Sequence, residues 1–248
     1  MKKTQKKLQK RYITSTEGEV FHVLNRGVDK RDIFLDKSDY FRFIHNLFEF
    51  NDATPALNLG YQFNQNQPID FVSQYNKRQR KLIVEVLTFC LMPNHFHLLL
   101  RQKAEGGITK FMRKLGIGYA KYFNQKYQRT GALFEGRYKL ILVENEAHFI
   151  YLPYYIHFNP LDIIMPEWRN KRIRDYRKAI NFLESYRWSS HLDYMGIKNF
   201  PSITQREFLL EIFRGPGHYK EMVRNWLQEM DLSTIKREAL EPIDFVSQ

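Results

Sequence analysis

The chain has 248 residues, of which 43% are hydrophobic and 15% aromatic, and its formal net charge is +12 at pH 7. This composition supports a packed core and excludes wholesale disorder, while the excess of lysine and arginine is typical of nucleic-acid-binding proteins. The single cysteine, Cys90, excludes a disulfide framework and a cysteine-rich zinc site. No stretch approaches the roughly eighteen consecutive apolar residues of a membrane span, so we expect a cytoplasmic protein without membrane contact.

The first part of the chain carries strand and helix patterns in turn. Residues 19–25 predict a strand, and Asp36 is placed to cap a following helix. The apolar residues of that helix share one face: Tyr40, Phe43, Ile44, Leu47 and Phe48. Residues 51–81 are polar and predict a loop. Residues 82–89 predict a buried strand, and a turn at 93–94 leads into a second strand, which gives an antiparallel pair.

The middle of the chain continues the alternation. Residues 108–127 predict an amphipathic helix, although two glycines inside it weaken the pattern. Residues 138–143 predict a strand, and Asn145 is placed to cap a helix that runs towards Phe158. The order strand, helix, two strands, helix, strand, helix predicts an α+β fold in which helices cover one face of a mainly antiparallel sheet.

The character of the sequence changes after Pro166. A basic run occupies residues 169–178, and further helical patterns follow towards the C-terminus. We therefore divide the chain into a basic N-terminal arm (1–18), a main α+β domain (19–166) and a mainly helical C-terminal extension (167–248).

One heptapeptide, Pro-Ile-Asp-Phe-Val-Ser-Gln, occurs twice, at residues 68–74 and at residues 242–248. One interpretation is a recent duplication without a function. The other is that both copies fit one groove, so that the tail competes with the internal copy or exchanges between two protomers. A homodimer is a predicted partner on the second interpretation.

Two histidines, His95 and His97, flank Phe96 in the second strand of the predicted pair. Because strand side chains alternate between faces, both imidazoles project to one side and Phe96 to the other. Two neutral imidazoles on one face form part of an open metal site. A half-buried strand edge that carries two histidines without any metal is an equally good reading of this motif alone.

The predicted helix that ends near Phe158 carries Tyr155 and Asn159 one turn apart on one face. A metal held by the two histidines could take the side-chain oxygen of Asn159 as a third ligand, with the Tyr155 phenol close to what the metal polarises. Phosphoryl transfer needs such a Lewis acid and nucleophile. The alternative is an aromatic helix face packed into the core, which is our interpretation of Tyr151 and Tyr154.

Five segments together resemble the single-tyrosine HUH transposases, and specifically the branch of REP-associated tyrosine transposases. These segments are residues 21–27, 91–99, 131–139, 155–160 and 188–190. The resemblance runs from about residue 19 to residue 195. It implies a ferredoxin-like antiparallel sheet and a metal-dependent single-stranded DNA endonuclease and strand transferase. In that family a tyrosine attacks a phosphodiester of hairpin DNA with a single-stranded flank, leaving a 5′-phosphotyrosine link and a free 3′-hydroxyl.

Carried over to this chain, the resemblance implies that His95 and His97 bind the metal, that Asn159 is the third ligand and that Tyr155 is the nucleophile. The family uses Mg²⁺ or Mn²⁺. Imidazole is a soft ligand for Mg²⁺, so we expect Mn²⁺ to bind more tightly here.

Two positions depart from the family pattern. Pro153 lies two residues before Tyr155, where a proline removes a helix hydrogen bond and favours a kink. Either the helix begins near Pro153 or the kink aims the tyrosine, and Tyr154 is the reserve nucleophile. Glu135 stands where the family commonly has glutamine, a change that is either neutral or alters the charge near the DNA.

Single-stranded or hairpin DNA is the predicted partner, which places the protein at the nucleoid. Phosphate contacts are predicted from basic residues in and around the motifs: Arg26, Arg31, Lys110, Arg113, Lys114, Lys121, Arg129, Arg137 and Lys139. Aromatic residues among them could stack on unpaired bases. Two alternatives to the tyrosine transposase remain open: a regulator that binds hairpin DNA without cleaving it, and a histidine–metal hydrolase that uses an activated water.

Overall fold

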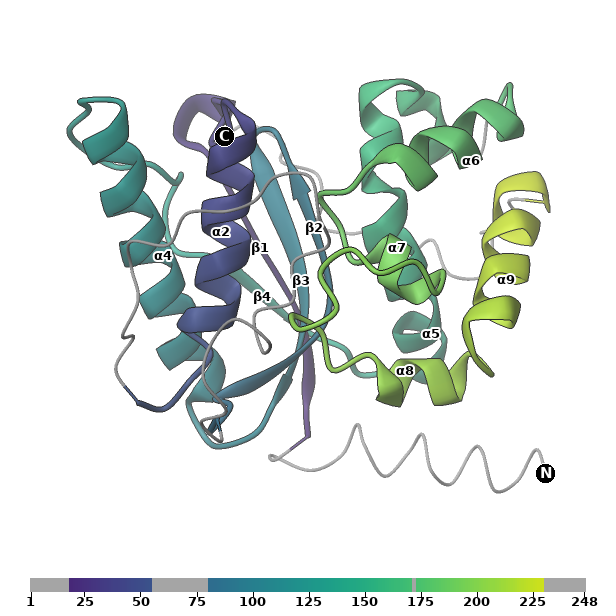
Figure 1. Ribbon diagram of the computed structural model, residues 1–248, viewed down its shortest axis with the longest axis horizontal. Helices are drawn as coiled ribbons and strands as arrows, with labels where there is room; N and C mark the ends of the chain where they lie inside the picture. The colour runs from purple at the N-terminus through teal and green to yellow at the C-terminus, as the bar shows by residue number, and fades with distance from the viewer. Residues whose placement is uncertain (1–17, 55–79, 171–172, 230–248) are drawn as a thin grey trace.

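The computed structural model describes residues 18–54, 80–170 and 173–229 (Figure 1). The basic arm lies almost wholly outside the described residues. Both copies of the repeated heptapeptide also lie outside them, so the shared groove and the homodimer stay predictions. Among the described residues, no helix is long and apolar enough to cross a membrane.

Within the described residues, four strands form one antiparallel sheet in the order β2-β3-β1-β4. They are β1 (Val20–Arg26), β2 (Val84–Met92), β3 (His95–Gln102) and β4 (Lys139–Leu142). Helix α2 (Lys37–Glu49) connects β1 with β2, and helix α4 (Gly107–Lys126) connects β3 with β4. This order of elements and strands is the expected ferredoxin-like arrangement, and the predicted α+β fold with an antiparallel sheet is confirmed.

Helices α2 and α4 pack side by side on one face of the sheet (Figure 1). Asp36 caps α2 as predicted, because its side chain accepts hydrogen bonds from the backbone N–H groups of Ser38 and Asp39. The core under these helices contains strand residues such as Val23, Phe96 and Leu98 together with the apolar stripes of both helices. These side chains alternate along the strands with those that face the other side.

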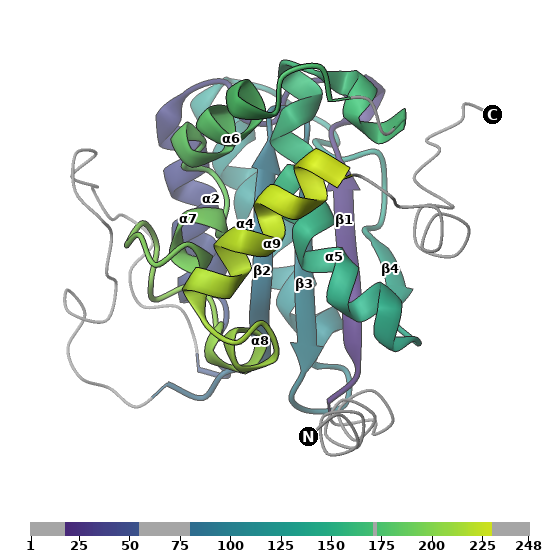
Figure 2. The same ribbon diagram turned by 90° about the vertical axis from the view of Figure 1, so that its right-hand side faces the viewer.

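The opposite face of the sheet is covered by α5 (Glu146–Phe158). The sequence predicted that all of the helices would cover one face, and for α5 this prediction is wrong. Strand β2 explains the difference, because almost all of its residues are buried, which requires cover on both faces of the sheet. Figure 2 shows α5 and the C-terminal helices in front of the sheet. The sheet thus lies between two helical layers.

Short helices follow α5 and complete this second layer. They are the 3-10 helices η2 (Asn159–Ile163) and η3 (Pro166–Asn170), then α6 (Tyr176–Ser185), α7 (His191–Tyr194), α8 (Glu207–Ile212) and α9 (Pro216–Glu229). The ring of Tyr154 in α5 stacks on Tyr219 in α9 at 5.2 Å between centroids. The His157 ring forms two hydrogen bonds of 2.7 Å, from Nδ1 to the Tyr219 hydroxyl and from Nε2 to the Ser190 hydroxyl. The core is therefore continuous across residue 166, where the sequence placed a boundary.

Candidate active site

Both motif histidines lie on β3 and face the α5 side of the sheet. Their ring centroids are 5.0 Å apart. Phe96 points to the other face, where its ring lies 4.9 Å from that of Phe43 in the α2–α4 core. The alternation that the sequence predicted for His95, Phe96 and His97 is the one the structure has.

A third histidine, His22 on β1, joins the pair. Its Nε2 lies 2.9 Å from Nδ1 of His97, and both side chains are buried. His22 belongs to the family-like motif at residues 21–27, but the sequence predicts no role for it. Alternation along β1 could have placed it, because Val20 and His22 share a face and β1 pairs directly with β3.

Tyr155 projects from α5 onto these histidines. Its ring centroid lies 6.2 Å from that of His97 and 6.4 Å from that of His22, edge-on in both cases. Helix α5 does not begin at Pro153: Asn145 caps it by accepting a hydrogen bond from the His148 N–H at 2.7 Å, and Pro153 lies inside it. Tyr155 is thus carried to the site by a helix that continues on both sides of the proline.

The neighbouring tyrosines have other surroundings. Tyr154 is buried between α8 and α9, where its ring lies 5.1 Å from Phe213 in addition to its stack on Tyr219. Tyr151 is also buried, 5.4 Å from the Trp226 ring. Both are core residues, and of the three tyrosines Tyr155 is the one whose ring contacts the histidines.

Arg169 in η3 connects the tyrosine with Asn159. Its guanidinium donates a hydrogen bond of 2.7 Å to the Tyr155 hydroxyl and one of 2.9 Å to Oδ1 of Asn159. Asp162 fixes the arginine through both carboxylate oxygens, at 2.8 and 2.5 Å. The sequence showed Arg169 only as the start of a basic run, because the two short 3-10 helices that aim it leave no periodic pattern.

The charges of these groups follow from their burial. Desolvation lowers the pKa of His22 to about 3 and that of His95 to about 3, with the positive charge of Arg169 adding to the effect at His95. Burial also holds the pKa of His97 well below its usual value. Burial raises the pKa of Tyr155, and the Arg169 charge opposes that rise. At neutral pH the site therefore contains neutral imidazoles, a phenol and one guanidinium.

The predicted metal ligands fit in part. Nδ1 of His95 lies 2.6 Å from Oδ1 of Asn94, and Nδ1 of His97 is engaged by His22. With protons on both Nδ1 atoms, each Nε2 presents a lone pair to a metal. Asn159 differs, because its Oδ1 accepts from Arg169 and its amide nitrogen donates to the Tyr155 carbonyl at 2.8 Å. The described chain holds no cluster of three or more His, Cys, Asp or Glu side chains suited to a metal.

The predicted DNA contacts have varied surroundings. Arg26 lies opposite His95 in the sheet and pairs with Glu135 at 2.9 Å. Lys114 donates to the carbonyl of Asp52 at 2.7 Å and so stabilises the turn after α2. Several of the others are exposed on α4, in the segment before β4 and at its start: Lys110, Arg113, Lys121, Arg137 and Lys139. Arg31 pairs with Asp29 at 3.6 Å, and Arg129 lies over the Phe123 ring at 5.6 Å.

Comparison with known proteins finds a family similarity over part of the chain. Residues 63–159 match the family model described as IS200-like transposase. A solved REP-associated tyrosine transposase bound to a REP hairpin aligns with a TM-score of 0.39 and 11% identity, over 60% of this chain and 70% of that one. No curated protein matches. The matched segment contains the histidine pair, Tyr155 and Asn159, whereas His22 and Arg169 lie outside it. Over residues 63–159, the chain is therefore similar to the IS200-like transposases.

Proposed function

We propose that this protein is a metal-dependent single-stranded DNA endonuclease and strand transferase that acts at hairpin repeats, with Tyr155 as its nucleophile. The observation that carries the proposal is the position of Tyr155. Its ring lies against His97 and His22, and its hydroxyl accepts a hydrogen bond from Arg169. The similarity of residues 63–159 to the IS200-like transposases supports a transposase function, and the tyrosine chemistry is our inference from this geometry.

In the proposed step the Tyr155 oxygen forms a bond to phosphorus, and the bond from phosphorus to the 3′-oxygen breaks. The phenol proton passes to solvent as the new bond forms, and the released 3′-oxygen takes up a proton from solvent. Arg169 stabilises the negative charge that develops on the tyrosine oxygen. The phosphotyrosine ester conserves the energy of the phosphodiester, so a 3′-hydroxyl can reverse the step and join a new strand.

The neutral imidazoles of His95 and His97 are suited to hold Mn²⁺ or Mg²⁺, with Asn159 as a third ligand once Arg169 releases its oxygen. A bound ion would act as a Lewis acid on the phosphate. Because a guanidinium and a divalent cation repel each other, we expect Arg169 to turn from Asn159 towards the DNA phosphate when the ion binds.

Binding of hairpin DNA without cleavage is the second candidate. One observation favours it: Tyr155 is only 1% exposed, and its hydroxyl is held by Arg169. Cleavage requires η3 or the end of α5 to move far enough for a phosphate to reach the phenol.

Incubation with labelled hairpin DNA that has single-stranded flanks, in the presence of Mn²⁺, separates the candidates. We expect a protein–DNA adduct that survives denaturing electrophoresis. Cleaved DNA without an adduct would instead indicate hydrolysis by an activated water. A complex with neither product nor adduct would indicate the non-cleaving regulator.

The Glu135→Gln variant is expected to bind DNA about two- to five-fold more tightly at low salt, because it removes the negative charge that pairs with Arg26. The gain should shrink as salt is raised, since phosphate contacts are screened. Affinity is measured by fluorescence anisotropy across a salt series. Glu85→Gln is the matched control, because Glu85 is also ion-paired, with Arg101, but at the other end of the sheet. Equal affinities for Glu135→Gln and wild type would exclude an effect of this charge on the DNA.

A further inference from the structure

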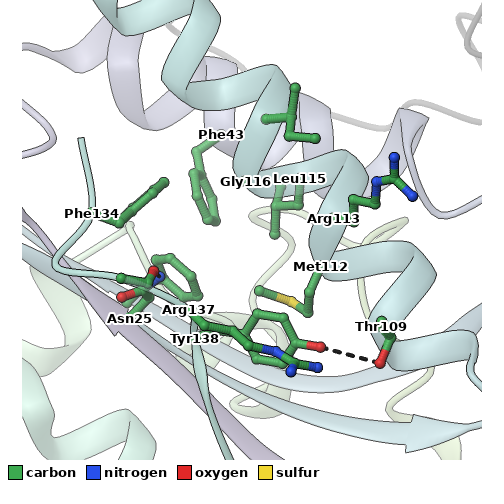
Figure 3. Close-up of a pocket in the computed structure, with 13 residues that line it drawn as sticks. Asn25, Phe43, Thr109, Met112, Arg113, Leu115, Gly116, Phe134, Arg137 and Tyr138 are labelled. Carbon is green, nitrogen blue, oxygen red and sulfur yellow. Dashed lines mark hydrogen bonds between the residues drawn. The ribbon is translucent and has the colours of Figure 1, made fainter. Parts of the chain in front are cut away.

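A pocket of about 390 Å³ opens on the face of the sheet opposite the histidines (Figure 3). It lies between α4, the end of β1 and the segment 134–138 that precedes β4. Its wall includes Phe96, the residue between the two motif histidines. Strand β3 therefore carries the candidate active site on one face and a wall of this pocket on the other.

The inner surface of the pocket is aromatic. The rings of Phe43, Phe134 and Tyr138 face the same space in Figure 3, together with the side chain of Met112. The Phe134 ring stands edge-on to Phe96 at 6.0 Å, and both Phe134 and Tyr138 are half-buried. The Tyr138 hydroxyl donates to Oγ1 of Thr109 at 3.3 Å, which fixes the ring at the rim. Flat aromatic walls of this kind suit a flat aromatic ligand.

The mouth of the pocket is positively charged. Arg113 on α4 and Arg137 before β4 both belong to the lining and are both exposed. None of the 13 described residues that line the pocket carries a carboxylate. A ligand with an aromatic body and anionic ends matches this combination, whereas an aliphatic or cationic ligand does not.

Neighbouring residues of β1 connect the pocket with the candidate active site. Asn25 lines it and donates from its side-chain amide to the Gly136 carbonyl at 3.1 Å. The next residue, Arg26, lies opposite His95 in the sheet. A single DNA strand that passes the end of β1 would therefore contact the histidine face and the pocket in succession.

We propose that this pocket takes one unpaired base of single-stranded DNA, with Arg113 and Arg137 on the adjoining phosphates. The inference rests on the proposed function in that DNA is the ligand. Stacking of a base on an aromatic side chain stabilises a complex with single-stranded DNA whatever the identity of the base. The pocket would thus give preference to DNA that presents an unpaired base beside the hairpin.

Gly116→Leu tests the proposal by filling the pocket. Gly116 lines it, and an added Cβ there meets no atom within 4 Å. Leucine is also a better helix former than glycine, so α4 should not be weakened. We expect the affinity for a hairpin with a single-stranded flank to fall about tenfold, and the affinity for a blunt hairpin to stay unchanged. Gly217→Leu in α9 is the matched control, since its Cβ position is equally open and lies away from the pocket.

The outcomes separate the pocket from the proposed function. Wild type that binds no DNA would overturn the proposed function and the pocket together. Wild type that binds flanked hairpins, with Gly116→Leu binding them equally well, would overturn only the pocket. If the wild type self-associates, loss of that association in Gly116→Leu with unchanged DNA binding would overturn the proposal and make a second copy of the chain the occupant. A strand carrying 5-iodouracil at single positions provides a direct readout, because the base in the pocket should crosslink to a peptide that contains Phe134 or Tyr138.

Discussion

The Tyr155→Phe variant is expected to form no covalent adduct with DNA while still binding flanked hairpin DNA. Phenylalanine keeps the ring against His97 and His22 but removes the oxygen that attacks phosphorus. The lost hydrogen bond from Arg169 should cost only about 1 kcal/mol of stability. Denaturing electrophoresis of labelled DNA measures the adduct, and anisotropy measures binding by the same samples.

Tyr154→Phe is the matched control, because it removes the same atom one residue earlier. Tyr154 stacks on Tyr219 in the second core and does not contact the histidines. This variant should form the adduct at a rate close to that of wild type. An adduct that persists in Tyr155→Phe and disappears in Tyr154→Phe would make the reserve residue the nucleophile. Persistence in both variants would exclude either tyrosine.

The sheet and its first two helices could be predicted because their residues obey a simple periodicity. Helix α4 is an example, since its apolar residues repeat with helical spacing despite two internal glycines. The structure explains Gly118, because a Cβ there would collide with the Phe50 ring. Gly116 lines the pocket. Features that seem to weaken a pattern in the sequence can thus be required by packing.

The rest of the site depends on contacts between distant segments, which periodicity does not contain. His22 and His97 meet because β1 pairs with β3 in one particular register, across 75 residues of sequence. Arg169 lies within hydrogen-bond distance of the Tyr155 hydroxyl because the short helices η2 and η3 bring it there and Asp162 holds its guanidinium by hydrogen bonds. The position of α5 on the second face depends on strands that are buried on both faces. A run of apolar residues predicts a buried strand, but it does not predict which helix covers which of its faces.

The His97→Ala variant is expected to lose adduct formation and to bind Mn²⁺ at least about 100-fold more weakly. It removes one of the two imidazoles that we propose as metal ligands. His22→Phe should have a smaller effect, about 10- to 100-fold, because His22 only orients His97 through its ring nitrogen. Isothermal titration with Mn²⁺ measures the affinity, and His218→Ala in α9 is the control for removal of a histidine elsewhere.

The pH dependence distinguishes this buried site from an exposed pair of histidines. Protons compete with the metal only below the pKa of each imidazole. Since burial lowers the pKa of His95 to about 3, Mn²⁺ affinity should be nearly constant between pH 8 and pH 6. An exposed pair would lose affinity below its ordinary pKa of about 6.5.

If His97→Ala bound Mn²⁺ as tightly as the wild type, the histidine pair would be excluded as the metal site. Loss of Mn²⁺ binding with an unchanged adduct yield would instead show that the tyrosine reacts without the metal, with Arg169 as the group that stabilises the charge.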